Sequence, residues 1–196
     1  MGQIFFDDTT TNHFTFIDCR NAQAFCNGHY KGALFVGDDE ATEERIAVIE
    51  NIPPDACFIV NSIDASNWSG KKMQLKSSDF FVWDDAVKIP SEKLDMCIEL
   101  DLEEFLLDYQ YDEFFLIDVR TTEDFQKGSI EHAQSIPLED IMQSIIDLDS
   151  NVPYYIFSNS FENAVFAASI FKQNGFNLVR VVSANYDEIA AALKKK

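Results

Sequence analysis

Few side chains in this 196-residue sequence could act as strong nucleophiles, and four of them are cysteines: Cys19, Cys26, Cys57 and Cys97. A cysteine attacks an electrophile as its thiolate, so a reactive one must be exposed and have a lowered pKa. No pair shows C-x-x-C spacing, and three lie within or beside apolar runs, which predicts reduced and mostly packed thiols in a cytosolic protein. Cys26 lies beside Asn27 and Gly28 and is the best candidate for exposure. Cys19, Cys26 and His29 match no zinc-binding spacing, so we expect no metal site.

A different candidate is the stretch YYIFSNSFEN (154–163), in which an aromatic-rich apolar run stops at Ser158 in a short polar loop. Loops that lead from a strand into a helix commonly carry active sites. A serine hydroxyl is not ionised at neutral pH unless a base lies beside it. The three histidines, His13, His29 and His132, are distant from this loop in the sequence. We therefore expect the loop to have no nucleophilic chemistry.

The charge balance restricts the classes of partner. The sequence has 34 acidic and 15 basic residues, for a net charge of −19. Such a field repels nucleic acids and anionic membranes, so we expect neither as a partner. No apolar stretch approaches the roughly 20 residues of a membrane span, and the start of the chain does not resemble a secretory signal. These features predict a soluble cytoplasmic protein.

The sequence contains an internal repeat. The segments FIDCRNAQAFCNGHYKGALFV (16–36) and LIDVRTTEDFQKGSIEHAQSI (116–136) are offset by 100 residues. Six residues of the first segment recur at the shifted position without a break in register: Ile17, Asp18, Arg20, Phe25, Gly28 and Ala33. This regular offset indicates a duplicated unit.

The elements around the repeat predict an α/β fold. In each half a helix-like stretch, a proline-containing turn and a short apolar strand follow the repeated segment; the strands are 57–60 and 154–157. A polar loop, a helix and a last strand come next, at 80–83 and 177–183. Strands that alternate with helices predict two tandem units, each a small parallel sheet with helices on both faces. We expect units at 1–92 and 93–196, divided by a polar linker at 90–96 that contains Pro90.

A repeated Asp-x-Arg turn is expected to shape both halves. Asp18 and Asp118 end the first strands of the repeat, at the edge where open α/β sheets place their sites. Their partners at i+2, Arg20 and Arg120, can hold acidic neighbours in bidentate pairs. The expected neighbours in the second half are Glu123 and Asp124, and a tight turn is expected at Gly28 and Gly128.

The second half resembles the rhodanese-like family. The resemblance is carried by LIDVRTTEDFQKGSIEHAQSIP and by the later helix and strand AASIFKQNGFNLVRVVS; the first half resembles the family more weakly through FIDCRNAQAFCNGHYKGA. The resemblance implies catalysis by a cysteine that opens the loop before this helix, with an arginine five residues later. That thiolate would accept sulfur or, in related phosphatases, attack phosphorus.

Both halves depart from this pattern. At the cysteine position the sequence has Ser158 and Asn61, and at the arginine position it has Asn163 and Ser66. Serine cannot form a persulfide, so sulfur transfer through Ser158 is chemically excluded. The departures favour a non-catalytic tandem that acts as a binding or regulatory module. The predicted binding segment is Ser158, Asn159, Ser160, Phe161, Glu162 and Asn163.

Two alternatives remain. One is a sulfurtransferase or phosphatase-like enzyme that uses a displaced cysteine, which would have to be Cys19, Cys26 or Cys57 in an exposed setting. The other is an anion or metabolite sensor that keeps the loop amides without the reaction; Glu162 and Asp64 oppose an anionic ligand. We expect a protein partner or a small anion as the ligand, and no cofactor.

Overall fold

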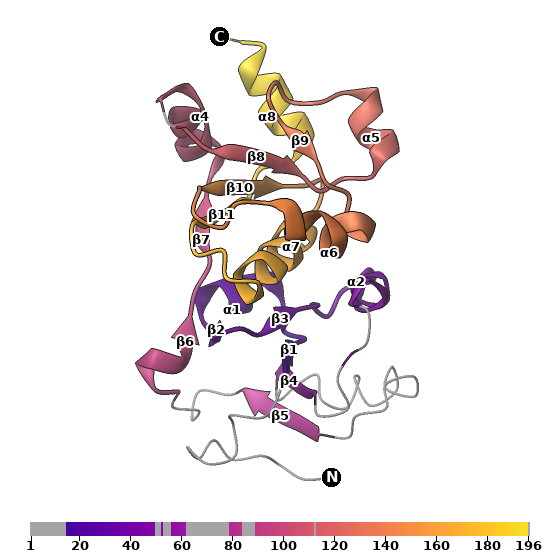
Figure 1. Ribbon diagram of the computed structural model, residues 1–196, viewed down its shortest axis with the longest axis vertical. Helices are drawn as coiled ribbons and strands as arrows, with labels where there is room; N and C mark the ends of the chain where they lie inside the picture. Colours follow the sequence, from indigo (N-terminus) through magenta and orange to yellow (C-terminus); the bar gives the residue numbers. More distant parts are fainter. Residues whose placement is uncertain are drawn as a thin grey trace. The chain divides into compact units, whose positions relative to one another are not determined.

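A computed structural model describes residues 15–49, 52, 56–61, 79–83, 89–111 and 113–195 (Figure 1). The chain divides into two compact units, Met1–Met96 (unit 1) and Cys97–Lys196 (unit 2). Each unit contains its own parallel sheet with helices between the strands. The predicted α/β class is therefore confirmed.

Unit 2 is built on a five-stranded parallel sheet with the order β7-β11-β10-β8-β9. The strands are β7 (Ile98–Leu100), β8 (Phe115–Asp118), β9 (Gln134–Ser135), β10 (Tyr154–Phe157) and β11 (Val179–Val182). The three inner strands, β8, β10 and β11, are mostly buried, as expected for strands covered on both faces.

Helices cover the two faces of this sheet (Figure 1). Helices α4 (Leu102–Tyr111) and α8 (Tyr186–Leu193) lie on one face, and α6 (Ile141–Ser144) and α7 (Phe161–Gln173) lie on the other. Alternate side chains of β10 pack against the helices on opposite faces of the sheet. Tyr155 and Phe157 belong to a core cluster with Phe105 of α4, whereas Tyr154 packs edge-on against Phe171 of α7, with ring centroids 5.3 Å apart. The remaining helices of unit 2 are α5 (Thr122–Lys127), η4 (Leu138–Asp140) and η5 (Ile145–Asp147).

Unit 1 has a four-stranded parallel sheet with the order β3-β1-β4-β5. The strands are β1 (Phe16–Asp18), β3 (Leu34–Phe35), β4 (Cys57–Asn61) and β5 (Asp79–Trp83), and the helices are α1 (Ala22–Asn27) and α2 (Thr42–Val48). This order matches that of β9-β8-β10-β11 in unit 2, with β3 corresponding to β9, β1 to β8, β4 to β10 and β5 to β11. Asp18 pairs with Phe35 as Asp118 pairs with Ser135, so even the register is the same at the repeated aspartate.

The segment 90–96 has regular structure and belongs to unit 1. It contains the 3-10 helix η3 (Ser91–Lys93) and the strand β6 (Leu94–Asp95), which pairs antiparallel with β2 (His29–Tyr30). The Lys31 amide also donates a 2.8 Å hydrogen bond to the Lys93 carbonyl. The polar sequence was expected to be a linker, but these backbone hydrogen bonds make it a short ribbon.

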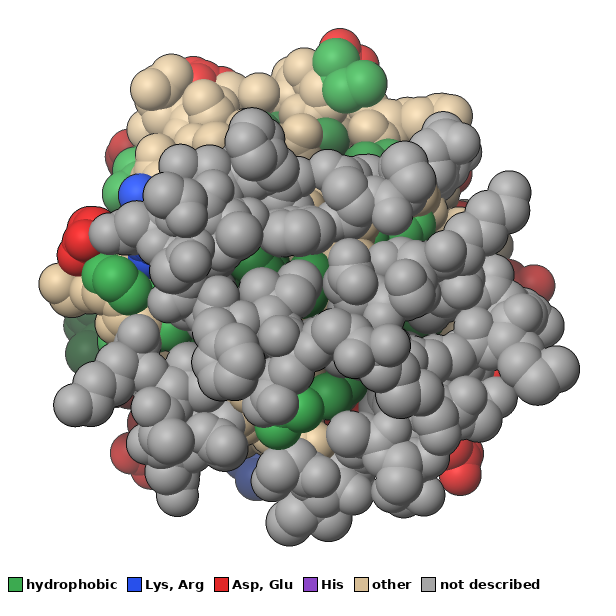
Figure 2. All heavy atoms as spheres, turned by 90° about the horizontal axis from the view of Figure 1, so that it is seen from below, with side chains coloured by type: hydrophobic (Ala, Val, Ile, Leu, Met, Phe, Trp, Pro, Cys, Tyr) green, Lys and Arg blue, Asp and Glu red, His purple; other side chains and the backbone are tan. Residues whose placement is uncertain are grey.

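The surface reflects the acidic composition. Acidic side chains of described residues recur around the rim of the face drawn in Figure 2. A transmembrane helix needs about 20 apolar residues, and the described part of the chain contains no helix that meets this requirement.

Candidate functional site

The predicted binding segment begins where β10 ends. Strand β10 stops at Phe157 and α7 starts at Phe161, so the loop between them consists of residues 158–160. The Val119 amide donates a hydrogen bond to the Phe157 carbonyl over 3.1 Å, which holds this strand end beside the end of β8. The segment therefore lies at the carboxyl edge of the sheet, where α/β folds place their sites.

Its side chains differ in exposure. Ser158 is 4% exposed and Asn159 is exposed, whereas Ser160 and the three residues that follow it are half-buried. Phe161, Glu162 and Asn163 form the first turn of α7. Half of the segment that the sequence predicts as a loop is therefore helical.

The start of α7 is capped from within. The Ser160 hydroxyl oxygen accepts a 3.3 Å hydrogen bond from the Asn163 amide and donates one of 2.9 Å to Glu162 Oε2. A serine cap of this kind satisfies one of the open amides at a helix start, and an acidic residue in the first turn is favoured by the helix dipole. The Asn163 amide and the positive end of the helix dipole could bind an anion, but the side chains of Ser160 and Glu162 already interact with them.

No general base activates Ser158 in the described structure. Within the residues described, no histidine or carboxylate hydrogen-bonds the Ser158 hydroxyl. The neighbouring hydrogen bonds join Ser160, Glu162 and Asn163 to one another. A serine nucleophile needs an adjacent base, and this arrangement does not supply one.

Beside the loop, Asp118 and Arg120 form a buried ion pair. Arg120 Nε lies 2.9 Å from Asp118 Oδ1, one terminal nitrogen lies 2.6 Å from Oδ2, and the Arg120 amide donates to Oδ1 over 3.0 Å. The same terminal nitrogen donates to the Gly128 carbonyl over 2.8 Å. The guanidinium carbon lies 3.8 Å from the centre of the Tyr186 ring, a cation–π contact that closes the outer side.

This geometry corrects the expected partners of Arg120. The acid that it holds is Asp118, and neither Glu123 nor Asp124 pairs with it. Glu123 is exposed, and Asp124 pairs with Lys127 at 3.1 Å in the first turns of α5. The hydrogen bond from Lys127, together with that from Thr121, holds the pKa of Asp124 below its usual value. These two acids therefore belong to the helix surface.

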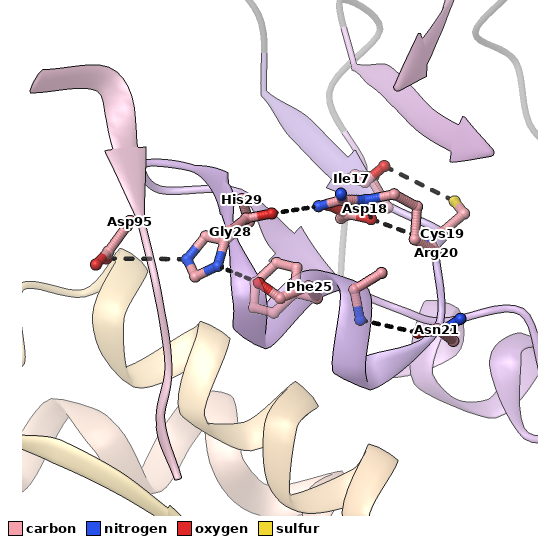
Figure 3. Close-up of polar contacts among 10 residues, drawn as sticks. Ile17, Asp18, Cys19, Arg20, Asn21, Phe25, Gly28, His29 and Asp95 are labelled. Atoms are coloured by element: carbon pink, nitrogen blue, oxygen red, sulfur yellow. Dashed lines mark hydrogen bonds and ion pairs between the residues drawn. The ribbon is translucent and has the colours of Figure 1, made fainter. Parts of the chain in front are cut away.

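Unit 1 contains the same arrangement (Figure 3). Arg20 Nε lies 2.9 Å from Asp18 Oδ1, a terminal nitrogen lies 2.6 Å from Oδ2, and that nitrogen donates to the Gly28 carbonyl over 2.7 Å. Here the guanidinium carbon lies 4.1 Å above the ring of Trp83, from the end of β5. Sequence reasoning missed both aromatic covers; the available signal was an aromatic residue at or shortly after the last strand of each half.

The space around the repeated glycine differs between the two units. The expected tight turns are present, because the Gly28 and Gly128 amides donate to the Phe25 and Phe125 carbonyls over 3.1 and 3.2 Å. The φ angles of the two glycines are 166° and 171°, which any residue can adopt, so neither turn needs glycine for its backbone conformation. A Cβ on Gly128 would lie 2.2 Å from the Tyr186 hydroxyl oxygen, whereas one on Gly28 would lie 3.6 Å from a Leu94 methyl group. Steric exclusion therefore operates at Gly128 alone.

The cysteines proposed as displaced nucleophiles are inside unit 1. Cys19, Cys26 and Cys57 are free thiols and buried, and Cys26 faces inward from α1. Burial, reinforced by the nearby Asp18 carboxylate, raises the pKa of Cys19 well above its ordinary value. A reactive cysteine needs the opposite environment. Cys97, at the start of unit 2, is half-buried.

His29 is held within a packed environment. Its ring stacks on Phe25 with centroids 3.8 Å apart, and Nδ1 lies 2.9 Å from the Phe25 carbonyl oxygen. Its Nε2 lies 3.8 Å from Asp95 of β6 (Figure 3). The side chain thus connects α1 to the ribbon made by β2 and β6.

The pairing of the strands shows that the unit 1 residue equivalent to Ser158 is one position earlier than predicted. Asp18 pairs with Ile59 and Asp118 pairs with Phe157, so the residue that follows the paired position is Val60 in unit 1 and Ser158 in unit 2. Asn61, expected to match Ser158, is the next residue and ends β4. Ser66 and Asp64 lie outside the described residues.

Comparison with known proteins identifies unit 2. Residues 101–192 match the family model described as Rhodanese-like domain. They form a rhodanese-like domain, as the sequence resemblance predicted for this half. The matched range lies wholly within unit 2.

Solved structures include similar chains. A protein from Staphylococcus saprophyticus subsp. saprophyticus is 24% identical over 47% of this chain and 92% of its own, with a TM-score of 0.44. A single-domain sulfurtransferase from Saccharomyces cerevisiae is 12% identical over 50% of this chain and 92% of its own, with a TM-score of 0.44. A Rhodopseudomonas palustris protein described as a possible tyrosine phosphatase is 11% identical over 49% of this chain and 81% of its own, with a TM-score of 0.44. No curated protein matches the sequence.

Proposed function

We propose that this chain is a pair of rhodanese-like units that bind a protein partner in the cytoplasm without catalysing sulfur or phosphoryl transfer. One observation carries the proposal. A buried serine hydroxyl, with no base hydrogen-bonded to it in the described structure, opens the loop where the family resemblance implies a cysteine thiolate. Serine cannot carry a persulfide, so the first step of sulfur transfer has no acceptor there.

The start of α7 supports a protein partner over a small anion. Asn163 stands where the resemblance implies an arginine, and its amide is engaged by Ser160. The Glu162 carboxylate lies in the same turn and would repel an incoming anion. Asn159 is exposed and Phe161 is half-buried, which offers a mixed polar and aromatic contact. We assign partner contact to the segment Ser158–Asn163.

Unit 1 supports the proposal of a duplicated scaffold. Its strands have the same order as the four corresponding strands of unit 2, and its Asp18–Arg20 pair repeats the distances of Asp118–Arg120. Val60, at the place equivalent to Ser158, is buried and has no nucleophilic atom. Neither unit therefore offers a nucleophile at this strand end.

An enzyme that uses Cys19, Cys26 or Cys57 would need one of these thiols at the surface. All three are buried, and the pKa of Cys19 is raised rather than lowered. The free state of all four cysteines agrees with a reducing compartment.

The test is a thiosulfate:cyanide sulfurtransferase assay on the purified full chain, with an active single-domain sulfurtransferase as the positive control. We expect thiocyanate formation equal to buffer, and the same result with p-nitrophenyl phosphate as a phosphatase substrate. Turnover that disappears when one of the four cysteines is changed to serine would overturn the proposal and identify the displaced nucleophile.

A further inference from the structure

A cavity lies at the edge of the unit 2 sheet opposite the Ser158 loop. It has a volume of about 600 Å³ and is formed around the residues that precede and begin β8 and those that precede β10. In a parallel sheet the amino ends of the strands lie opposite the carboxyl ends, so this cavity is separate from the Ser158 loop. Its lining includes Tyr109, Glu113, Phe114, Phe115, Glu131 and His132.

Aromatic rings form fixed walls of this cavity. Tyr109 and Phe114 are inclined at 57° with centroids 6.4 Å apart, and Phe114 is stacked on Tyr155 at 3.9 Å. The Tyr109 hydroxyl donates to the Glu131 carbonyl over 2.8 Å, which fixes the position of that ring. Phe115 is stacked on Tyr154 at 5.6 Å, yet 52% of its surface is exposed. These rings are therefore held in place before any ligand arrives.

The rim of the cavity is acidic. Glu113 and Glu131 line it, the Glu131 side chain is 81% exposed, and no lysine or arginine is among the described residues of the lining. Burial raises the pKa of Tyr109, and the nearby Glu131 carboxylate adds to the shift. The net charge of −19 acts in the same direction. His132 also lines the cavity, and its Nε2 lies 3.6 Å from Glu131 Oε1.

The backbone at the rim is unusual. His132 has a φ of 63°, in the left-handed region, which is uncommon outside glycine although histidine, like asparagine and aspartate, adopts it more readily than most residues. Such conformations are found preferentially at ligand sites, where the surrounding structure maintains them. Here the hydrogen bond from Tyr109 to the adjacent Glu131 carbonyl contributes to that support.

Aromatic faces and carboxylates together attract one class of ligand. A quaternary or alkylated ammonium group gains cation–π attraction from the rings and Coulomb attraction from the acids, while its methyl groups match an apolar wall. The volume falls within the 300–1,000 Å³ of small-molecule sites. A neighbouring cavity of about 310 Å³ shares Glu113 and Pro153 but contains Arg180, whose charge is paired with Asp108 at 3.0 Å. We propose that the larger cavity binds a small organic cation of the alkylammonium class.

The experiment compares choline with 3,3-dimethylbutan-1-ol, its uncharged isostere, by isothermal titration of the full chain at constant ionic strength. We expect one site for choline in unit 2 and at least tenfold weaker binding of the neutral alcohol. Glu131→Gln and Phe115→Leu should each weaken choline binding several-fold, because each removes one source of attraction from an exposed side chain.

Glu139→Gln provides the matched control, because Glu139 is an exposed acid of η4 outside the lining. It should leave choline affinity unchanged, and thermal unfolding should show that all variants fold. Equal affinity for choline and the alcohol, no binding of choline, or equal loss in Glu131→Gln and Glu139→Gln would each overturn the proposal. The outcome is independent of the sulfurtransferase assay, which reports on the opposite edge of the sheet.

Discussion

Units 1 and 2 have the same buried aspartate–arginine pair at the end of corresponding strands, β1 and β8, but a different aromatic residue covers the arginine in each unit. In unit 1 the arginine lies under Trp83, at the end of the last strand; in unit 2 it lies under Tyr186, in the helix that follows the last strand. The pair itself varies by no more than 0.1 Å between corresponding hydrogen bonds to the aspartate. The comparison shows that the turn geometry is fixed by the local Asp-x-Arg sequence, whereas its cover depends on the surrounding elements.

The two units also differ in whether the glycine beside the arginine could be replaced by a larger residue. Tyr186 occupies the space beside Gly128, and Leu94 leaves ordinary room beside Gly28. The two glycines occupy the same position of the repeat and have similar backbone angles, so their different tolerance arises from the side chains packed against them. The two units also differ at the residue that follows the strand partner of the repeated aspartate. This residue is Val60 in unit 1 and Ser158 in unit 2.

The largest expected effect tests what the units share. Asp118→Asn and Asp18→Asn should each lower the free energy of unfolding by about 3–5 kcal/mol, because each leaves a buried guanidinium without its counter-charge. Urea denaturation of the full chain, followed by circular dichroism, measures this loss. Asp124→Asn is the control. Its carboxylate pairs with Lys127 at the surface, so its loss should lower the free energy of unfolding by no more than about 1 kcal/mol. A negligible effect at one of the buried aspartates would break the equivalence of the two turns.

The next effect tests where the units differ. Gly128→Ala should destabilise the protein by about 1–3 kcal/mol, the usual cost of inserting a methyl group into a packed site. Gly28→Ala should have little effect. Adding Tyr186→Phe to Gly128→Ala should recover part of the loss, because it removes the oxygen that lies 2.2 Å from the new carbon. Thermal unfolding of the four proteins gives the comparison, and equal sensitivity of the two glycines would contradict it.

A pH effect between pH 8.5 and 10.5 should arise from a buried cysteine of unit 1. The pKa of the Cys19 thiol is raised above 9.0 by burial, so above that pH the unfolded chain loses a proton that the folded chain retains. Stability from this group is complete below about pH 9 and falls as pH rises toward the folded pKa, by at most about 1.4 kcal/mol per pH unit. Unit 2 has Val119 at the corresponding position, so Cys19→Val should make the stability between pH 8.5 and 10.5 flatter. An unchanged pH profile would show that Cys19 makes no such contribution.

The smallest effect concerns the loop. With the four native cysteines replaced, Ser158→Cys combined with Asn163→Arg should have a thiol pKa below the roughly 8.5 of a free cysteine, because the helix start and the guanidinium favour thiolate. Adding Glu162→Gly should lower it further. The rate of alkylation by iodoacetamide against pH measures this pKa. Val60→Cys, in a fully buried strand position, should react far more slowly; similar rates at the two sites would remove the distinction between the units.

The sequence by itself determined the features that depend on local order. The offset of 100 residues, the alternation of strands and helices and the rhodanese-like character of the second half were all predicted from patterns along the chain. Apolar runs and turn residues express the backbone preferences of short segments, and a repeat preserves them in the same order. The Asp-x-Arg turns were predictable for the same reason, since their partners are two residues apart.

Tertiary structure decided which side chains meet across elements. It left Glu123 and Asp124 unpaired with Arg120, brought Tyr186 over that arginine, and paired residues 94–95 with 29–30. It also fixed the register that matches Ser158 with Val60, and assembled Tyr109, Phe114 and Glu131 around one cavity. These contacts join residues whose separation along the chain has no bearing on their distance in space. Only the packing of complete elements, with its close-range steric and electrostatic demands, determines them.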